Sequence, residues 1–192
     1  MAEDGNSFWS YIVDIIETVV VALAIFVVVY LFLLQPHQVK GASMQPNFTD
    51  GEYILTDKIS YRFAKPQRGD VIIFQAPTDP EVDFIKRIIG LPGEQVKITD
   101  GKIVIYNAEH KNGFTLNEPY SILGPTSGGK DAPQNTEVSI PNDQYFVLGD
   151  NRVESFDSRS WGMLPKNKII GKAWLRYWPI NKLGFVKHAK YN

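Results

Sequence analysis

The sequence has 192 residues, no cysteine, and 20 lysines and arginines against 21 aspartates and glutamates. This balance shows no signature of nucleic-acid binding, and the lack of cysteine excludes disulfides and thiol chemistry while leaving the compartment open. A long apolar run near the N-terminus precedes residues 35–192, which are enough for one domain with a sizeable core.

The apolar run from Thr18 to Leu34 contains no charged residue. As a helix it would extend about 25 Å, slightly less than the ~30 Å apolar core of a bilayer, and the preceding turn from Tyr11 supplies the difference. A cleavable signal peptide is the alternative, but such peptides begin with basic residues. The first ten residues here contain acidic residues and no lysine or arginine. We therefore expect a retained single-pass anchor within residues 1–35.

Beyond the apolar run, the sequence consists of short β-branched or aromatic segments bounded by Gly, Pro, Asp or Asn, a pattern typical of strands. These segments are 52–56, 70–74, 84–89, 145–148 and 169–178, and the pair 96–99 and 102–106. The last pair flanks Asp100 and Gly101, a strong hairpin signal. No later segment keeps a helical period over three turns. We expect a mainly β domain of antiparallel sheets over residues 36–192, with a loop-rich insertion at about 107–144.

The first candidate for chemistry is Ser43, which lies between small residues shortly after the apolar run, in Gly41-Ala-Ser43-Met44. A serine nucleophile needs a base, and a catalytic histidine usually sits in a turn that orients its ring. None of the three histidines lies in a Gly/Asp-rich turn of this kind: His37, His110 and His188. A lysine can serve instead if burial lowers its pKa. Lys86 is placed for that role.

The neighbours of Lys86 favour a neutral amine. Alternate side chains of a strand share a face, so Phe84 and Ile88 would flank Lys86 with large apolar groups. Such surroundings lower the pKa of a lysine from its usual value of about 10.4. The alternatives are that Lys86 and Arg87 are solvent-facing charges near a strand end, and that Ser43 is an ordinary turn serine.

A polar segment, residues 149–162, follows the expected strand 145–148. Its composition alone is typical of a solvated loop. It also combines hydroxyls, arginines, acids and a tryptophan, which suits a loop that braces a site. A hydrogen-bond network there could orient Lys86, as a third group orients the base in a catalytic triad.

Taken together, these segments resemble the bacterial type I signal peptidases (leader peptidases), a family of Ser/Lys membrane proteases. The resemblance covers most of residues 8–178 and rests on four motifs in order. They are Gly41-x-Ser43-Met44-x-Pro46, Arg68-Gly69-Asp70-Val71, Lys86-Arg87-Ile-Ile-Gly90-Leu-Pro-Gly93-Glu94, and Gly149-Asp-Asn-Arg152 with Ser155, Asp157-Ser158-Arg159 and Trp161-Gly162.

The resemblance implies roles for five of the matched residues and implies no metal or cofactor. Ser43 would be the nucleophile and Lys86 the general base, and the Ser155 hydroxyl would help to position the Lys86 amine. Asp157 and Arg159 would hold the loop. The Ser43 backbone N–H would be an oxyanion-hole donor.

The sequence departs from the family pattern in two places. Some members have a serine two residues before the nucleophile as a second oxyanion donor, and this chain has Gly41 there. One such donor can be worth about 3–4 kcal/mol. Members commonly have Asp-Asn where this chain has Val153 and Glu154. The second oxyanion donor and the local hydrogen bonding of the loop therefore stay open.

The resemblance also implies preprotein substrates with signal peptides, cut after a pattern of small residue, any residue, small residue. The residues near the nucleophile and base predict shallow pockets, because they are bulky and apolar, and a larger substrate side chain would cost about 1–3 kcal/mol. These expected pocket residues are Val39, Met44, Phe48 and Ile85.

The resemblance places the N-terminus inside the cell and the catalytic domain outside, on a protein anchored in the plasma-membrane bilayer. Lys40 and Lys58, the first basic residues after the run, oppose this orientation weakly, because positive residues favour the cytoplasmic side. We follow the resemblance, since the cleavage sites of exported substrates emerge on the outer side.

Two other functions are open from the sequence. One is a Ser/Lys protease of narrow specificity that cuts a single partner or itself. The other is an inactive membrane-anchored β-domain that binds a partner. The joint presence of Ser43, Lys86 and Ser155 favours an enzyme, because a binding module needs none of them.

Overall fold

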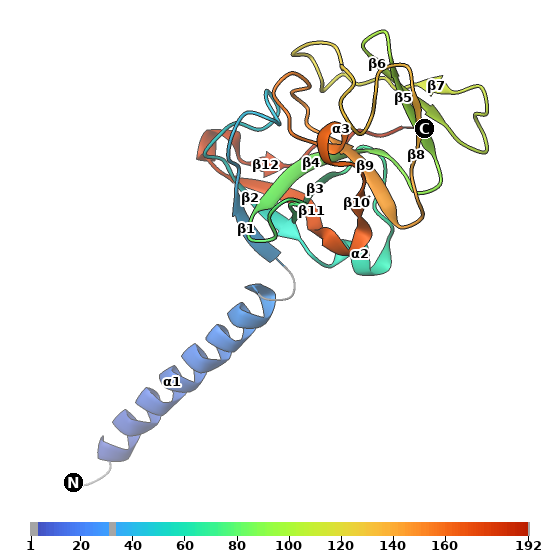
Figure 1. Ribbon diagram of the computed structural model, residues 1–192. Helices are drawn as coiled ribbons and strands as arrows, with labels where there is room; N and C mark the ends of the chain where they lie inside the picture. The colour runs from blue at the N-terminus through green and yellow to red at the C-terminus, as the bar shows by residue number, and fades with distance from the viewer. Residues whose placement is uncertain (1–3, 31–33, 192) are drawn as a thin grey trace.

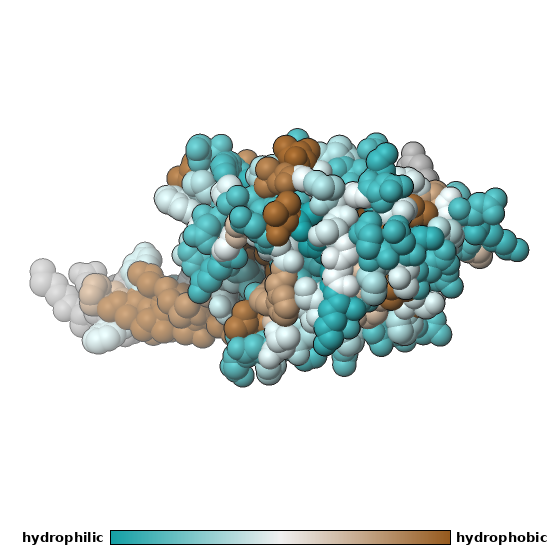
Figure 2. All heavy atoms as spheres, turned by 45° about the horizontal axis from the view of Figure 1, so that its top comes forward, coloured by the Kyte–Doolittle hydropathy of each residue, from teal (hydrophilic) through white to brown (hydrophobic). Residues whose placement is uncertain are grey.

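The computed structural model describes residues 4–30 and 34–191, which form an N-terminal helix and a β-rich domain (Figure 1). The segment Phe8–Val28 of helix α1 (Asp4–Val28) is long and apolar enough to cross a membrane, and it is not buried against the domain. Figure 2 shows the helix as a nearly continuous hydrophobic surface, whereas the visible face of the domain is mainly hydrophilic. The helix lies nearer the N-terminus than expected, because Leu34 already belongs to a strand.

Among the described residues, the larger sheet has eight antiparallel strands, in the order β1-β2-β11-β3-β4-β9-β10, with β12 paired to β11. The strands are β1 (Leu34–Gln38), β2 (Tyr53–Asp57), β3 (Val71–Gln75), β4 (Asp83–Gly90), β9 (Gln144–Leu148), β10 (Leu164–Pro165), β11 (Ile169–Trp178) and β12 (Gly184–Phe185). The sheet curls so that β1 approaches β4, where His37 Nε2 lies 3.1 Å from Asp83 Oδ2. This curl brings two strands that are not neighbours in the sheet to the sides of one cleft.

The smaller sheet has the order β7-β6-β5-β8 within the part of the chain that the structure describes. Its strands are β5 (Gln95–Thr99), β6 (Lys102–Tyr106), β7 (Phe114–Thr115) and β8 (Glu137–Ser139). The expected hairpin is present, and Asp100 and Gly101 both have positive φ, as a two-residue type I′ turn requires. Strands β7 and β8 come from residues 107–144, so the segment expected to be loop-rich also supplies both outer strands of this sheet.

A cluster of buried apolar side chains supports the region around Ser43. It consists of Val39, Met44, Phe48, Ile54, Val71, Ile73, Ile85, Ala173 and Val186. Two short helices, α2 (Ser60–Phe63) and α3 (Ser158–Trp161), lie in the connections between strands. The expected fold class, an N-terminal apolar helix followed by a mainly β domain of antiparallel sheets, is confirmed.

Candidate active site

Ser43 and Lys86 are in direct hydrogen-bond contact. Ser43 lies in the turn 41–48 between β1 and β2, and Lys86 lies within β4. The Lys86 amine nitrogen is 2.7 Å from the Ser43 hydroxyl oxygen and also donates to the Ile85 carbonyl oxygen at 3.1 Å. At this distance a neutral amine can take the proton of the serine hydroxyl.

The surroundings of Lys86 disfavour its charged form. The side chain is buried, and its amine lies 5.3 Å from the centre of the Phe84 ring. Burial lowers the pKa of Lys86 to about 8, while the negative charges of Asp157 and Asp150 act in the opposite direction. With that pKa, about a tenth of the molecules carry a neutral amine at pH 7, compared with fewer than one in a thousand for an ordinary lysine. The site therefore contains a usable base.

Ser43 and Lys86 line a cleft of about 320 Å³ between β1 and β4. Two of the residues expected to form the substrate pocket, Val39 and Ile85, line this cleft. The other two do not line it. Met44 and Phe48 are buried in the core cluster that also contains Val39 and Ile85, so they support the cleft from within the core.

Further apolar residues of the cleft come from strands that sequence reasoning did not connect with Ser43. Ile54 of β2 and Ile73 of β3 line it, and Ile73 is the cross-strand partner of Ile85. Phe156 and Glu154 of the 149–162 loop line it as well. The strand alternation was visible in the sequence, but the register that places Ile73 opposite Ile85 was not.

The loop after β9 holds the backbone of the turn 41–48, which carries Ser43. The Asn151 backbone N–H donates to the Ser43 carbonyl oxygen at 3.0 Å, and the Asn151 side chain donates to the Ala42 carbonyl oxygen at 3.2 Å. Gly149 permits this approach, because a Cβ atom there would lie 2.3 Å from both the Ser43 carbonyl oxygen and the Ser155 hydroxyl. Asn151 belongs to a matched motif, but its contact with the turn was not foreseen.

Buried ion pairs fix the same loop to the rest of the domain. Asp157 accepts hydrogen bonds from the Arg159 guanidinium at 2.8 and 2.9 Å and from the Gly149 N–H at 3.2 Å. Arg152 pairs with Glu118 at 2.6 Å. Because each buried arginine has a carboxylate partner, the loop is braced without an unpaired charge.

The Ser155 hydroxyl is buried and has no hydrogen-bond partner among the described residues. It lies beside Gly149 rather than in a hydrogen bond with the Lys86 amine. A buried hydroxyl without a partner is unfavourable, and such groups often mark functional positions. Its expected role in positioning Lys86 stays a prediction.

One backbone donor is available near the Ser43 hydroxyl. Within the described residues, the Ser43 N–H makes no hydrogen bond. Gly41 has a positive φ, and its own N–H is already used, since it donates to Asp50 at 2.7 Å. The turn thus offers the Ser43 N–H for a developing oxyanion, and Gly41 adds neither a side-chain donor nor a free backbone donor.

Comparison with known proteins identifies the family to which this chain belongs. The family model described as "Signal peptidase, peptidase S26" matches residues 12–178. The chain belongs to this family. It is 35% identical to "Probable signal peptidase I-2" of Synechocystis sp. over 88% of this chain and 75% of that protein. It is 32% identical to "Signal peptidase IB" of Staphylococcus aureus over 89% and 92% of the two chains.

Among solved structures, the chain is similar to a signal peptidase I from Enterococcus faecalis V583, with 33% identity and a TM-score of 0.44 over 57% of this chain and 97% of that one. The family match confirms the resemblance seen in the sequence. It also confirms that the protein is a signal peptidase of the serine-protease type, and hence a hydrolase.

Proposed function

We propose that this protein is a membrane-bound endopeptidase that removes signal peptides from exported preproteins, with Ser43 as nucleophile and Lys86 as general base. The observation that carries the proposal is the 2.7 Å contact between the serine hydroxyl and a buried amine of lowered pKa, both of which line a mainly apolar cleft. The names of the similar proteins support the substrate class.

The geometry suits a two-step hydrolysis. Ser43 Oγ attacks the carbonyl carbon of the scissile bond while Lys86 Nζ takes the hydroxyl proton. The oxygen that gains charge can accept a hydrogen bond from the Ser43 N–H. The Lys86 ammonium then protonates the leaving amine as the C–N bond breaks, which leaves an ester on Ser43. Lys86 next takes a proton from the water that attacks this ester, and returns it to Ser43 Oγ.

The cleft can hold the substrate as an extended strand. Two strand edges have no partner among the described residues. One is the edge of β4 that faces away from β3, from Asp83 to Lys86, and the other is the edge of β1 that faces away from β2. A peptide between them would make main-chain hydrogen bonds and send alternate side chains toward Val39 and Ile85. Small residues fit such shallow positions, which supports the expected small-residue rule.

We propose that α1 spans the plasma membrane and that the catalytic domain lies on the outer side, because the cleavage sites of exported proteins emerge there. The basic residues Lys40 and Lys58 act weakly against it. Protease added outside spheroplasts should digest the domain and leave α1 protected. Digestion only after lysis would contradict this orientation.

The direct test incubates the detergent-solubilised full chain with model preproteins and sequences the new N-terminus. We expect one cut after a small residue, and loss of cleavage when leucine or phenylalanine replaces alanine just before the cut. Ile85→Ala should relax this rule, whereas Ile88→Ala, on the other face of β4, should not. Equal cleavage of alanine and phenylalanine substrates by the parent would favour a different specificity. Full activity of Ser43→Ala would remove the nucleophile assignment.

A further inference from the structure

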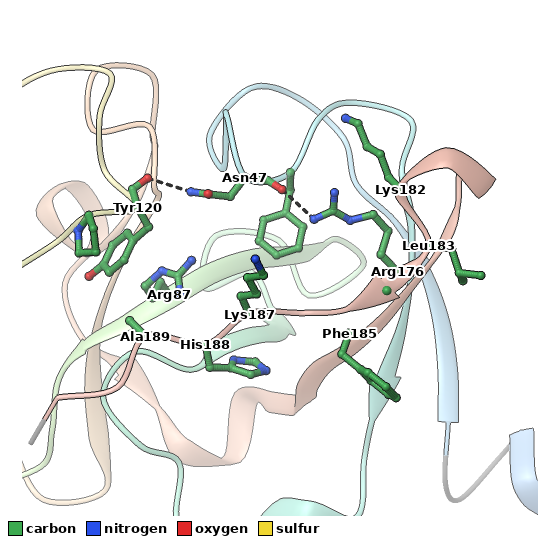
Figure 3. Close-up of a pocket in the computed structure, with 13 residues that line it drawn as sticks. Asn47, Arg87, Tyr120, Arg176, Lys182, Leu183, Phe185, Lys187, His188 and Ala189 are labelled. Atoms are coloured by element: carbon green, nitrogen blue, oxygen red, sulfur yellow. Dashed lines mark hydrogen bonds between the residues drawn. The ribbon is translucent and has the colours of Figure 1, made fainter.

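A second pocket, of about 590 Å³, lies at the Asn47–Phe48 end of the turn 41–48, which we call the nucleophile turn. It shares no lining residue with the cleft beside Ser43 and Lys86. Its lining includes Asn47 and Phe48 of the turn, Arg176 of β11 and the segment 182–185, followed by 187–189 (Figure 3). Nothing in the proposed reaction uses this pocket. Its charge and its rim indicate what it can bind.

The lining is strongly basic. Among the described residues, no carboxylate lines the pocket, and four cationic side chains do: Arg87, Arg176, Lys182 and Lys187. Figure 3 shows the Lys187 amine pointing between the Arg87 and Arg176 side chains, with Lys182 beyond Arg176. Arginine and lysine together are the side chains that proteins use to bind phosphate groups.

The carboxylates behind this lining neutralise only part of its charge. The single carboxylate of Glu52 faces two cations, with its oxygens 3.2 Å from Arg176 Nε and 2.8 Å from Lys182 Nζ. Asp150 pairs with Arg87 at 2.7 Å. Within the described residues, Lys187 has no ion-pair partner. Glu52 compensates only one of the two positive charges of Arg176 and Lys182, and the charge of Lys187 is not compensated by any described residue either. Two positive charges therefore remain to attract an anion.

The imidazole in the pocket does not add to this charge at neutral pH. His188 Nδ1 accepts the Val71 N–H at 3.1 Å, which fixes the ring as a neutral acceptor. Burial, together with the positive charge of Lys172, lowers the pKa of His188 to about 4 against the opposing charge of Asp70. The anion-binding capacity of the pocket thus comes from its lysines and Arg176.

The rim of the pocket is apolar and exposed. Leu183 and Phe185 are 61% and 70% exposed, and in Figure 3 both side chains point away from the cations. Phe185 also contacts Trp174, whose ring centre is 5.6 Å away, and Trp178 is half exposed on the same strand. Exposed aromatic groups beside a basic pocket are typical of surfaces that meet lipid.

The connection to α1 keeps this rim close to the bilayer when α1 spans it. Tyr30 and Leu34 are four residues apart, so their Cα atoms lie at most about 14 Å from each other. The rim strand β12 is separated from β1 by β11 and β2, which is three strand spacings, or about 14 Å. A lipid headgroup can therefore reach the pocket without detachment of the domain from the membrane.

We propose that this pocket binds the phosphate group of an anionic phospholipid, with Arg176, Lys182 and Lys187 around the phosphate and Leu183 and Phe185 against the start of the acyl chains. The pocket is continuous with the nucleophile turn, since Arg176 donates to the Asn47 carbonyl oxygen at 2.8 Å and lies 5.1 Å over the Phe48 ring. The bound lipid would hold the domain in one orientation at the membrane surface.

The test places the full chain in nanodiscs of phosphatidylcholine that contain a minority of phosphatidylglycerol with a photoreactive group near the start of one acyl chain. Crosslinks are mapped by mass spectrometry. We expect crosslinks in the segment 182–189, reduced about fivefold for each charge removed in Lys182→Gln and Lys187→Gln. Lys187 is exposed and makes no ion pair within the described residues, so Lys187→Gln should leave the fold unchanged. The matched control, Lys102→Gln with Lys111→Gln, removes two exposed charges at the smaller sheet.

Three outcomes would overturn the proposal. They are equal crosslinking by a phosphatidylcholine probe with the same acyl group, equal crosslinking in the Lys187→Gln variant, and complete competition by millimolar inorganic phosphate. The last result would assign the pocket to free phosphate instead of a lipid. Because crosslinking does not require cleavage, Ser43→Ala should give the parental pattern, which separates this proposal from the proposed enzymatic function.

Discussion

Lys86 and Arg87 are neighbours on β4 and both are buried, but in the part of the chain that the structure describes only Arg87 has a carboxylate partner. The Lys86 amine contacts a hydroxyl, a carbonyl oxygen and an aromatic ring, and among the described residues it has no carboxylate within ion-pair distance. Arg87 makes two hydrogen bonds to Asp150, at 2.8 and 2.7 Å, and a third to the Gly69 carbonyl oxygen. One cation is left unpaired and the other is fully paired.

This difference decides what each side chain can do. Burial alone would lower the pKa of Arg87, but the hydrogen bonds and charge of Asp150 raise it overall, so Arg87 is a permanent cation. Burial without a carboxylate partner lowers the pKa of Lys86 to about 8. The same strand therefore holds a permanent charge beside an amine that can lose its proton near neutral pH, and the presence of a carboxylate distinguishes them.

The largest expected effect comes from making the base a permanent cation. Lys86→Arg should lose activity as fully as Lys86→Ala, by about 10⁴-fold or more, because a guanidinium cannot give up its proton. Ser43→Ala should lose as much, and the double variant Ser43→Ala/Lys86→Ala should be hardly worse than either, since both residues serve one step. Cleavage rates of a model preprotein measure this. Substantial activity in Lys86→Arg would place the base elsewhere.

The two cations should also differ in their effect on stability. Asp150→Ala leaves the Arg87 charge buried and unpaired, so we expect a loss of about 3–5 kcal/mol in the free energy of unfolding. Lys86→Met should be as stable as the parent near pH 7 or more stable, by up to about 3 kcal/mol. Urea unfolding of the detergent-solubilised chains measures both. A clear destabilisation by Lys86→Met would mean that Lys86 is a charged structural residue.

The pH dependence of stability has a defined sign. The folded pKa of Lys86, about 8, lies below the value of about 10.5 in the unfolded chain. Between these two values the unfolded chain binds more protons, so the contribution of Lys86 to stability falls as pH falls from 10.5 to 8 and is constant below. This slope should be absent in Lys86→Met.

The smallest effect is a shift of the pH–rate profile. The kcat/KM should rise about tenfold per pH unit up to about pH 8 and then level off, as the Lys86 amine becomes neutral. The negative charge of Asp157 raises the pKa of Lys86. Asp157→Asn should therefore move the acidic limb to lower pH, by less than about one unit. Glu109→Gln, a remote and exposed change of equal charge, should leave the limb unchanged.

Much of the fold could be predicted from the sequence because its signals are local. The strands β2, β3, β4, β9 and β11 lie within one or two residues of the expected segments. The hairpin at Asp100 and Gly101 is encoded by its turn residues. The short strands β7 and β8 were missed, because two or three residues of strand among glycine and proline give no periodic pattern.

The site was predictable only in part. The proximity of Ser43 and Lys86 was expected from paired motifs, and the structure brings the two together. Met44 was expected in the substrate pocket because it follows Ser43, but sequence proximity does not fix the direction of a side chain in a turn. The pairing of Arg87 with Asp150 links residues 63 positions apart. No local signal specifies which acid accepts a buried arginine.

The edges of β1 and of β4 from Asp83 to Lys86, which have no strand partner within the described residues, have a consequence for the breadth of the substrate range. Hydrogen bonds made to a main chain are the same for every amino acid except proline, which has no N–H to donate. An enzyme that holds its substrate in this way can serve many unrelated client proteins, because only the few side chains near the scissile bond are inspected. The same arrangement gives secretory precursors a simple way to escape cleavage, since one proline whose nitrogen faces either edge removes a contact that no other residue would lose.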